Sequence, residues 1–147
     1  MNMLSATVLL AVVAATVLKD SDAYLSEAAI KKTQQMLKNV CSKKYSIEED
    51  VFTDIKKGIF PENNNIKCYF ACNFKTMQMV NPKGILDKKM FKDKMTMLAP
   101  PNVLEILLPA IDQCIGADKD TEICQSSYNF VKCAYRVDPK TLEFLPL

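Results

Sequence analysis

The sequence contains no histidine, and this absence narrows its chemistry more than any other feature. Histidine is the usual general base in enzymes, the most common zinc ligand and the only side chain that ordinarily titrates near neutral pH. Much enzyme chemistry and any histidine-driven pH switch are therefore disfavoured. The sequence also contains no tryptophan, only three glycines and no Asn-x-Ser/Thr sequence, so N-glycosylation is not expected. A net charge of +2 gives no strong attraction to nucleic acid or to an acidic membrane.

An uncharged apolar run occupies residues 4–18. It is shorter than the roughly 20 residues of a membrane-spanning helix but suits the apolar part of a secretory signal peptide. Ser21 and Ala23 place small residues at the two positions that a signal peptidase reads. We therefore predict a signal peptide at residues 1–23 and one secreted domain at residues 24–147, with no membrane insertion after cleavage. The alternative is a signal anchor that remains in the membrane.

The sequence after residue 23 shows recurrent helical spacing and no strand-like alternation of any length. This pattern predicts an all-α domain of six helices, without internal repeats or a second domain. The expected helices lie at about 27–40, 46–58, 66–79, 87–98, 103–115 and from 118 or 120 to 135.

Polar residues, glycines and prolines define the expected helix ends. Ser26 is expected to cap the first helix, a capping box of Ser46 and Glu49 the second, and Asp118 or Asp120 the sixth. Gly58 and Gly116 are expected to end the second and fifth helices, and Asp87 to begin the fourth. The first helix is expected to present an apolar face made of Ala29, Thr33, Met36, Leu37 and Val40.

The fifth expected helix is apolar on nearly every side, so we predict that it is central and buried. Pro109 lies within it and is expected to kink it. On the sixth, Cys124, Tyr128, Val131 and Tyr135 recur at helical spacing and are expected to share one face.

Six cysteines occur in the sequence, at positions 41, 68, 72, 114, 124 and 133. An even number in a secreted protein indicates disulfides. Cys68 and Cys72 are expected one turn apart on one helix, and Cys124 and Cys133 far apart along another, so neither pair can bond. Excluding these two pairs leaves ten of the fifteen pairings open. A zinc site would leave two cysteines over and a reactive thiol would lack an activating histidine, so neither a metal nor a cofactor is expected.

The cysteine spacing C-x26-C-x3-C-x41-C-x9-C-x8-C resembles that of the six-cysteine insect odorant-binding proteins, the pheromone and general odorant-binding family. Gly84-x-x-Asp87 and the segment CIGADKDTEIC agree with it as well. The resemblance implies helices stapled by three interlocked disulfides around an apolar internal pocket. It also implies the pairs Cys41–Cys72, Cys68–Cys124 and Cys114–Cys133.

The same resemblance implies a carrier without enzymatic activity. Such a protein binds small hydrophobic molecules such as odorants or pheromones and transports them through aqueous lymph, in the sensillum if the role is olfactory, to an olfactory receptor. We expect a monomer or a weak homodimer. Alternatives are a carrier of non-olfactory lipids or fatty acids, a disulfide-rich helical hydrolase that uses Asp or Glu, and a signalling or toxin-like protein that acts through its surface.

The pocket is expected between the third and sixth helices, with methionines that adapt to varied guests and tyrosine hydroxyls that orient them. Methionines at helical spacing also serve as ordinary core residues. Phe144 and Leu145 are expected either to fold over the entrance or to fray. The predicted ligand-binding residues are Met77, Met90, Phe91, Met95, Leu104, Leu107, Leu108, Ile111, Tyr128, Phe130, Val131, Tyr135, Phe144 and Leu145.

Four lysines, at positions 88, 89, 92 and 94, surround the fourth expected helix. We interpret them as a solvated face. The alternative is that they capture a fatty-acid carboxylate at the pocket rim.

Overall fold

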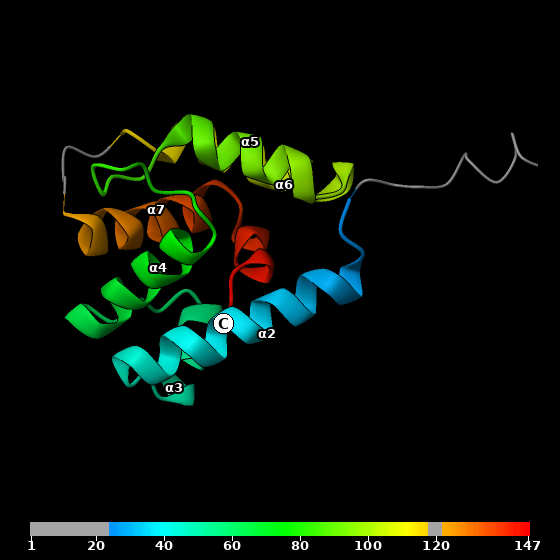
Figure 1. Cartoon of the computed structure of the whole chain (residues 1–147). Coiled ribbons are helices and arrows are strands. Elements are labelled where there is room, and N and C mark those ends of the chain that lie inside the picture. Colours follow the sequence, from blue (N-terminus) through cyan, green and yellow to red (C-terminus); the bar gives the residue numbers. More distant parts are fainter. Residues whose placement is uncertain (1–23, 118–121) are drawn as a thin grey trace, which may run out of the picture.

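Figure 1 shows the chain as a computed structural model, which describes residues 24–117 and 122–147. The predicted all-α class is confirmed: the strand-like pairing within these residues is an isolated bridge between Val80 and Leu86. The predicted signal peptide, Asp118 and Asp120 lie outside the described residues. The elements are α2 (Glu27–Tyr45), α3 (Glu49–Lys56), α4 (Asn64–Thr76), α5 (Lys88–Leu98), α6 (Pro101–Cys114), α7 (Ile123–Val137) and the 3-10 helix η1 (Pro139–Phe144).

Helix α2 begins where the sequence predicts, and part of its predicted apolar face is turned inward. Ser26 caps it by accepting a hydrogen bond from the backbone N–H of Ala29. Of the predicted apolar face, Leu37 is buried and Ala29 and Thr33 are half-buried, whereas Met36 and Val40 are 56% and 57% exposed, so the prediction is wrong for Met36 and Val40. The helix also continues to Tyr45 and, with 19 residues, is the longest helix in the described part of the chain (Figure 1).

The segment between α2 and α3 contradicts the predicted capping box. Ser46 adopts a left-handed conformation, with φ of 51°, and ends α2 instead of capping α3. Helix α3 begins at Glu49 without a side-chain cap. Gly58 follows α3 as predicted, with φ of +80°, and the Tyr135 hydroxyl approaches it too closely to leave room for a Cβ atom.

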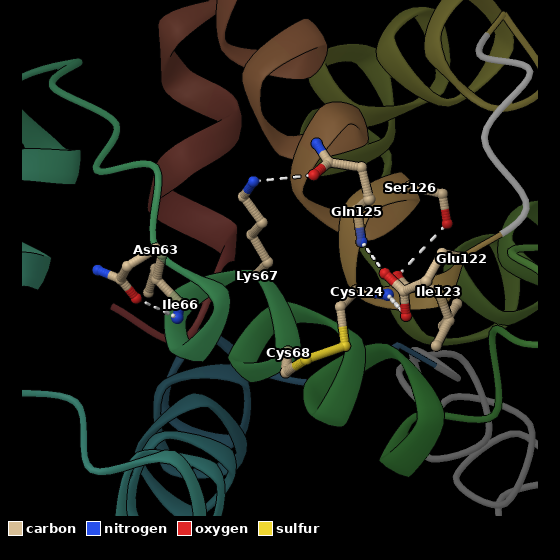
Figure 2. The surroundings of a disulfide bond; sticks show 9 residues. All are labelled: Asn63, Ile66, Lys67, Cys68, Glu122, Ile123, Cys124, Gln125 and Ser126. Atoms are coloured by element: carbon tan, nitrogen blue, oxygen red, sulfur yellow. Dashed lines mark hydrogen bonds between the residues drawn. A yellow bond between two sulfur atoms is a disulfide. The ribbon is translucent and has the colours of Figure 1, made fainter.

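Side-chain caps fix the starts of three later helices. Asn63 accepts from Ile66 N at the start of α4, and Asp87 accepts from Met90 N at the predicted start of α5. At α7 the cap is Glu122, whose carboxylate accepts from the N–H groups of both Cys124 and Gln125 (Figure 2). An acidic cap also suits the positive end of the helix dipole.

The most extensive packing between two helices joins α4 to α7, and these two helices form the centre of the fold. This finding corrects the prediction for the helix that contains Pro109, α6. Ala110, Ile111 and Cys114 of α6 are buried, but Leu104 and Leu108 are only half-buried because one side of α6 faces outward. The predicted kink at Pro109 stays a prediction.

Three disulfides link four helices in series. Cys41–Cys72 joins α2 to α4, Cys68–Cys124 joins α4 to α7, and Cys114–Cys133 joins α6 to α7. These are the pairs that the family resemblance implied. The two central helices therefore each carry two covalent links.

A cluster of opposite charges supports the α4–α7 pair at the surface. Glu62, just before α4, lies 3.1 Å from the ammonium of Lys67 and 2.6 Å from that of Lys132 on α7. Lys67 also donates to Gln125 across the helix pair (Figure 2). Hydrogen bonds from Lys132 and then Lys67 hold the pKa of Glu62 below its ordinary value of 4.5.

Replacing Cys68 and Cys124 together by serine is expected to lower the free energy of unfolding by about 2–4 kcal/mol, because the unfolded chain regains the freedom of a long loop. Replacing Cys114 and Cys133 should cost less, since that bond spans 19 residues rather than 56. Denaturant unfolding of the oxidised variants measures both effects. Equal stability of the wild-type protein and the Cys68/Cys124 variant would contradict this expectation.

Glu62→Gln is expected to destabilise the protein by less than about 1 kcal/mol per ion pair at neutral pH. The lowered pKa means that the charged form of Glu62 is favoured by folding, so its contribution is present above the ordinary pKa and is lost as pH falls through the folded-state pKa. Urea unfolding at several pH values should show wild type and variant converging in acid. Glu105→Gln, which changes an exposed carboxylate on α6, is the matched control. A pH-independent difference would argue against the ion-pair explanation.

Candidate ligand-binding cavity

Two small apolar cavities, of about 40 and 90 Å³, lie among the helices. The first is bounded by α4, α5, α6, α7 and the C-terminal segment, and the second by α2, α5, α6 and the same segment. The smaller cavity is lined by Asn73, Phe74, Met77, Met79, Phe91, Met95, Leu107, Ala110, Ile111, Phe130, Ala134, Thr141, Phe144, Leu145 and Pro146. The larger is lined by Leu25, Ile30, Thr33, Gln34, Leu37, Met77, Met95, Leu98, Ala99, Val103, Leu107, Phe144 and Pro146.

Five residues line both cavities and therefore lie between them: Met77, Met95, Leu107, Phe144 and Pro146. Two of the five are methionines, whose unbranched side chains change rotamer easily. A shift of these side chains would join the two cavities into one.

Three phenylalanines from three helices form an aromatic wall of the smaller cavity. The ring centres of Phe74, Phe91 and Phe130 lie between 5.1 and 5.5 Å apart in all three pairings, with the rings tilted or edge-on. Such geometry is favourable between aromatic rings. This packing makes the aromatic wall rigid, whereas the methionines that line the same cavity are adaptable.

The C-terminal segment closes the other side of the cavities. Gln34 Nε2 of α2 donates to the carbonyl oxygen of Glu143 at 2.8 Å, and the buried Tyr69 hydroxyl donates to that of Pro146. Burial raises the pKa of Tyr69, although the neighbouring Asn73 side chain lowers it. The tail thus packs between α2 and α7 instead of fraying, as Figure 1 shows for the red segment.

Eight of the fourteen predicted ligand-binding residues line these cavities. They are Met77, Phe91, Met95, Leu107, Ile111, Phe130, Phe144 and Leu145.

Both predicted tyrosines lie elsewhere. Tyr128 is fully buried between α4 and the segment before it, and its hydroxyl donates to the carbonyl oxygen of Pro61 at 2.7 Å. Tyr135 lies against Gly58 and Phe60 and borders a surface groove. Their hydroxyls point to the segment between α3 and α4, and neither tyrosine lines the cavities.

Four other predicted residues also lie outside the two cavities. Val131 is buried in the protein core, and Met90, Leu104 and Leu108 are half-buried. Met90 and Leu108 each directly precede or follow a cavity residue, so the turn of the helix directs them elsewhere. Because α6 is apolar on most sides, its sequence could not reveal which leucines face inward.

The predicted ligand-binding set contains no residue of α2 or of the segment before it, although Thr33 and Leu37 belong to the predicted apolar face of this helix and line the larger cavity. Ile30, Gln34, Leu37 and Cys41 recur at intervals of four, three and four, which is the signal that identifies the inward face. Asn73 and Thr141 were missed because polar residues were not sought in an apolar pocket.

The four lysines around α5 make contacts away from the cavities. Lys88 donates to the backbone oxygen of Asp112 and Lys92 to its carboxylate. Lys89 pairs with Asp93, and Lys94 donates to the side-chain oxygen of Gln78. Their placement agrees with a solvated face and does not support a role at a pocket rim.

The lining residues of the two cavities include no charged side chain. Two larger surface grooves, of about 710 and 790 Å³, each carry both lysine and glutamate side chains along their walls and are therefore poorer sites for an apolar guest. In the described part of the chain, no group of three or more His, Cys, Asp or Glu side chains is placed to hold a metal ion. None of the helices there has the length and apolar character needed to cross a membrane.

The model of the PBP/GOBP family matches residues 23–137 of the chain. This protein belongs to the PBP/GOBP family. In this structure, the cavities described above lie inside a frame of helices and disulfides. Members of the family are carrier proteins.

Individual relatives agree with the family assignment. General odorant-binding protein 72 of Anopheles gambiae is 24% identical over 117 residues, which cover 79% of this chain and 96% of the relative. The crystal structure of odorant binding protein 4 from Chrysopa pallens matches with a TM-score of 0.72 and 28% identity, over 82% of this chain and 98% of that one. Odorant binding protein 7 of Anopheles gambiae, solved with four disulfide bridges and an azo compound, matches with a TM-score of 0.66 and 21% identity, over 84% and 98%.

Proposed function

We propose that this protein carries small, uncharged hydrophobic molecules, odorants or pheromones among them, in the joined interior cavities. The observation that carries the proposal is an interior lined by apolar side chains and free of charge, within a carrier family. Secretion after loss of residues 1–23, passage through sensillum lymph, delivery to an olfactory receptor, and a monomeric or weakly dimeric state are parts of the same proposal.

Binding requires the interior to adapt, because the cavities are smaller than a guest of about a dozen heavy atoms. Met77 and Met95 separate them and are the side chains best suited to move. We expect such a guest to bind with a Kd in the micromolar range, about −7 to −8 kcal/mol. The azo compound bound by odorant binding protein 7 of Anopheles gambiae supports a small-molecule guest within this fold.

Ionised fatty acids are poorer candidates than neutral guests. A carboxylate inside either cavity would be buried without an opposite charge, which is costly. A carrier of neutral lipids outside the olfactory system remains the alternative, and a ligand panel separates it from an odorant carrier.

Leu107→Trp is expected to weaken binding of a hydrophobic fluorescent probe by at least about tenfold, because Leu107 lines both cavities and the larger ring fills them. Leu108→Trp is the matched control, since Leu108 is the next residue of α6, is half-buried as well and lies outside both cavities. Titration of the oxidised protein, followed by displacement with volatiles and neutral lipids, measures the effect. A wild-type protein that binds no probe would overturn the carrier proposal, and equal loss in both variants would overturn the location of the site.

Ligand affinity is expected to change little between neutral and mildly acidic pH. The protein has no histidine, and the cavity walls carry no acidic or basic side chain. Probe titrations across this pH range test the expectation, and a steep loss of binding near pH 6 would refute it.

A further inference from the structure

One wall of the smaller cavity contains a buried polar atom without a hydrogen bond. Asn73, in α4, is 1% exposed, and its Nδ2 donates to the carbonyl oxygen of Tyr69 at 3.0 Å. This bond sets the orientation of the amide, because a flipped amide would bring two oxygens together. The remaining atom, Oδ1, has no hydrogen-bond partner among the described residues.

The other polar side chains that line the two cavities have already used their donors. The hydroxyls of Thr33 and Thr141 donate to the backbone oxygens of Ala29 and Asp138. Gln34 Nε2 donates to the carbonyl oxygen of Glu143 at 2.8 Å and contacts that of Leu145 at 3.5 Å. Among the polar side chains that line the two cavities, Asn73 is therefore the one with a buried acceptor atom that has no hydrogen-bond partner.

Resting on the carrier function proposed above, we propose that Asn73 Oδ1 is a specificity site for guests with a hydroxyl group, such as alcohols and phenols. The guest hydroxyl donates to Oδ1 while its apolar part lies against the methionines and the aromatic wall. An ether or hydrocarbon of the same size leaves a desolvated oxygen without a donor, which weakens binding.

The position of Asn73 is fixed by its neighbours. It directly follows Cys72, whose disulfide to Cys41 anchors this turn of α4 to α2. Pro146, which accepts from the Tyr69 hydroxyl, lines the same cavity and places the C-terminal segment against it. The acceptor therefore lies in a rigid wall, as orientation of a guest requires.

The test uses nonanol, methyl octyl ether and decane, which have equal numbers of heavy atoms, and measures their Kd values by probe displacement from wild type and Asn73→Leu. We expect the ratio of the ether Kd to the nonanol Kd to fall by about fivefold to thirtyfold in the variant. The hydration of the free ligands cancels in this comparison between proteins. Decane should bind the variant at least as well as it binds wild type.

Ser127→Ala is the matched control variant. Ser127 is also fully buried and its Oγ also has no hydrogen-bond partner among the described residues, but it does not line either cavity. Its substitution should leave the ratio of the two Kd values unchanged.

A second measurement covers the case in which Asn73→Leu does not fold. In wild-type protein labelled with carbon-13 at asparagine side-chain carbonyls, nonanol should shift the Asn73 signal and methyl octyl ether should not. An unchanged Kd ratio in a folded variant, or identical spectra with both ligands, would overturn the role of Asn73. Failure of all three ligands and the probe to bind would instead overturn the carrier function itself.

Discussion

The disulfide between Cys68 and Cys124 holds together the two helices on which the rest of the fold is built, α4 and α7. One turn further along α4, the disulfide of Cys72 anchors α2. The next residue, Asn73, lines the smaller cavity. On α7, Cys133 anchors α6, which carries Leu107, Ala110 and Ile111 of the cavity lining. Every wall of the interior except α5 and the tail is thus tied covalently to this central pair.

Such a frame allows an interior that is less tightly packed than an ordinary core. A void of 90 Å³ costs about 2 kcal/mol in lost packing. A single disulfide contributes about 2–4 kcal/mol by restricting the unfolded chain, so one bond offsets the void. The cavity walls differ in rigidity. Phe74, Phe91 and Phe130 pack rigidly against one another, whereas the side chains of Met77 and Met95 can move to make room for a guest.

The sequence predicted the helical class, the helix caps at Ser26 and Asp87 and, through family resemblance, the disulfide pairs, because caps and cysteine spacing are local signals. The sixth expected helix, α7, begins later than predicted, at Ile123 with Glu122 as its cap. The sequence predicted the cavity less well. Burial of α6 depends on which side the neighbouring helices cover, and this information is absent from a helix that is apolar all round. The predicted capping box at Ser46 is wrong for a related reason. Helix α2 continues to Tyr45, so Ser46 ends that helix instead of capping α3. The sequence could not single out Asn73, because whether its Oδ1 has a hydrogen-bond partner depends on the folded structure.

The two cavities also have a mechanical consequence. Unfolding eliminates internal voids and so reduces the volume of the system, which means that hydrostatic pressure favours the unfolded chain. A guest that occupies the space between Met77, Met95 and Phe144 removes much of that volume difference. The loaded carrier is thereby less compressible than the empty one, and its response to pressure reports how completely the interior is filled.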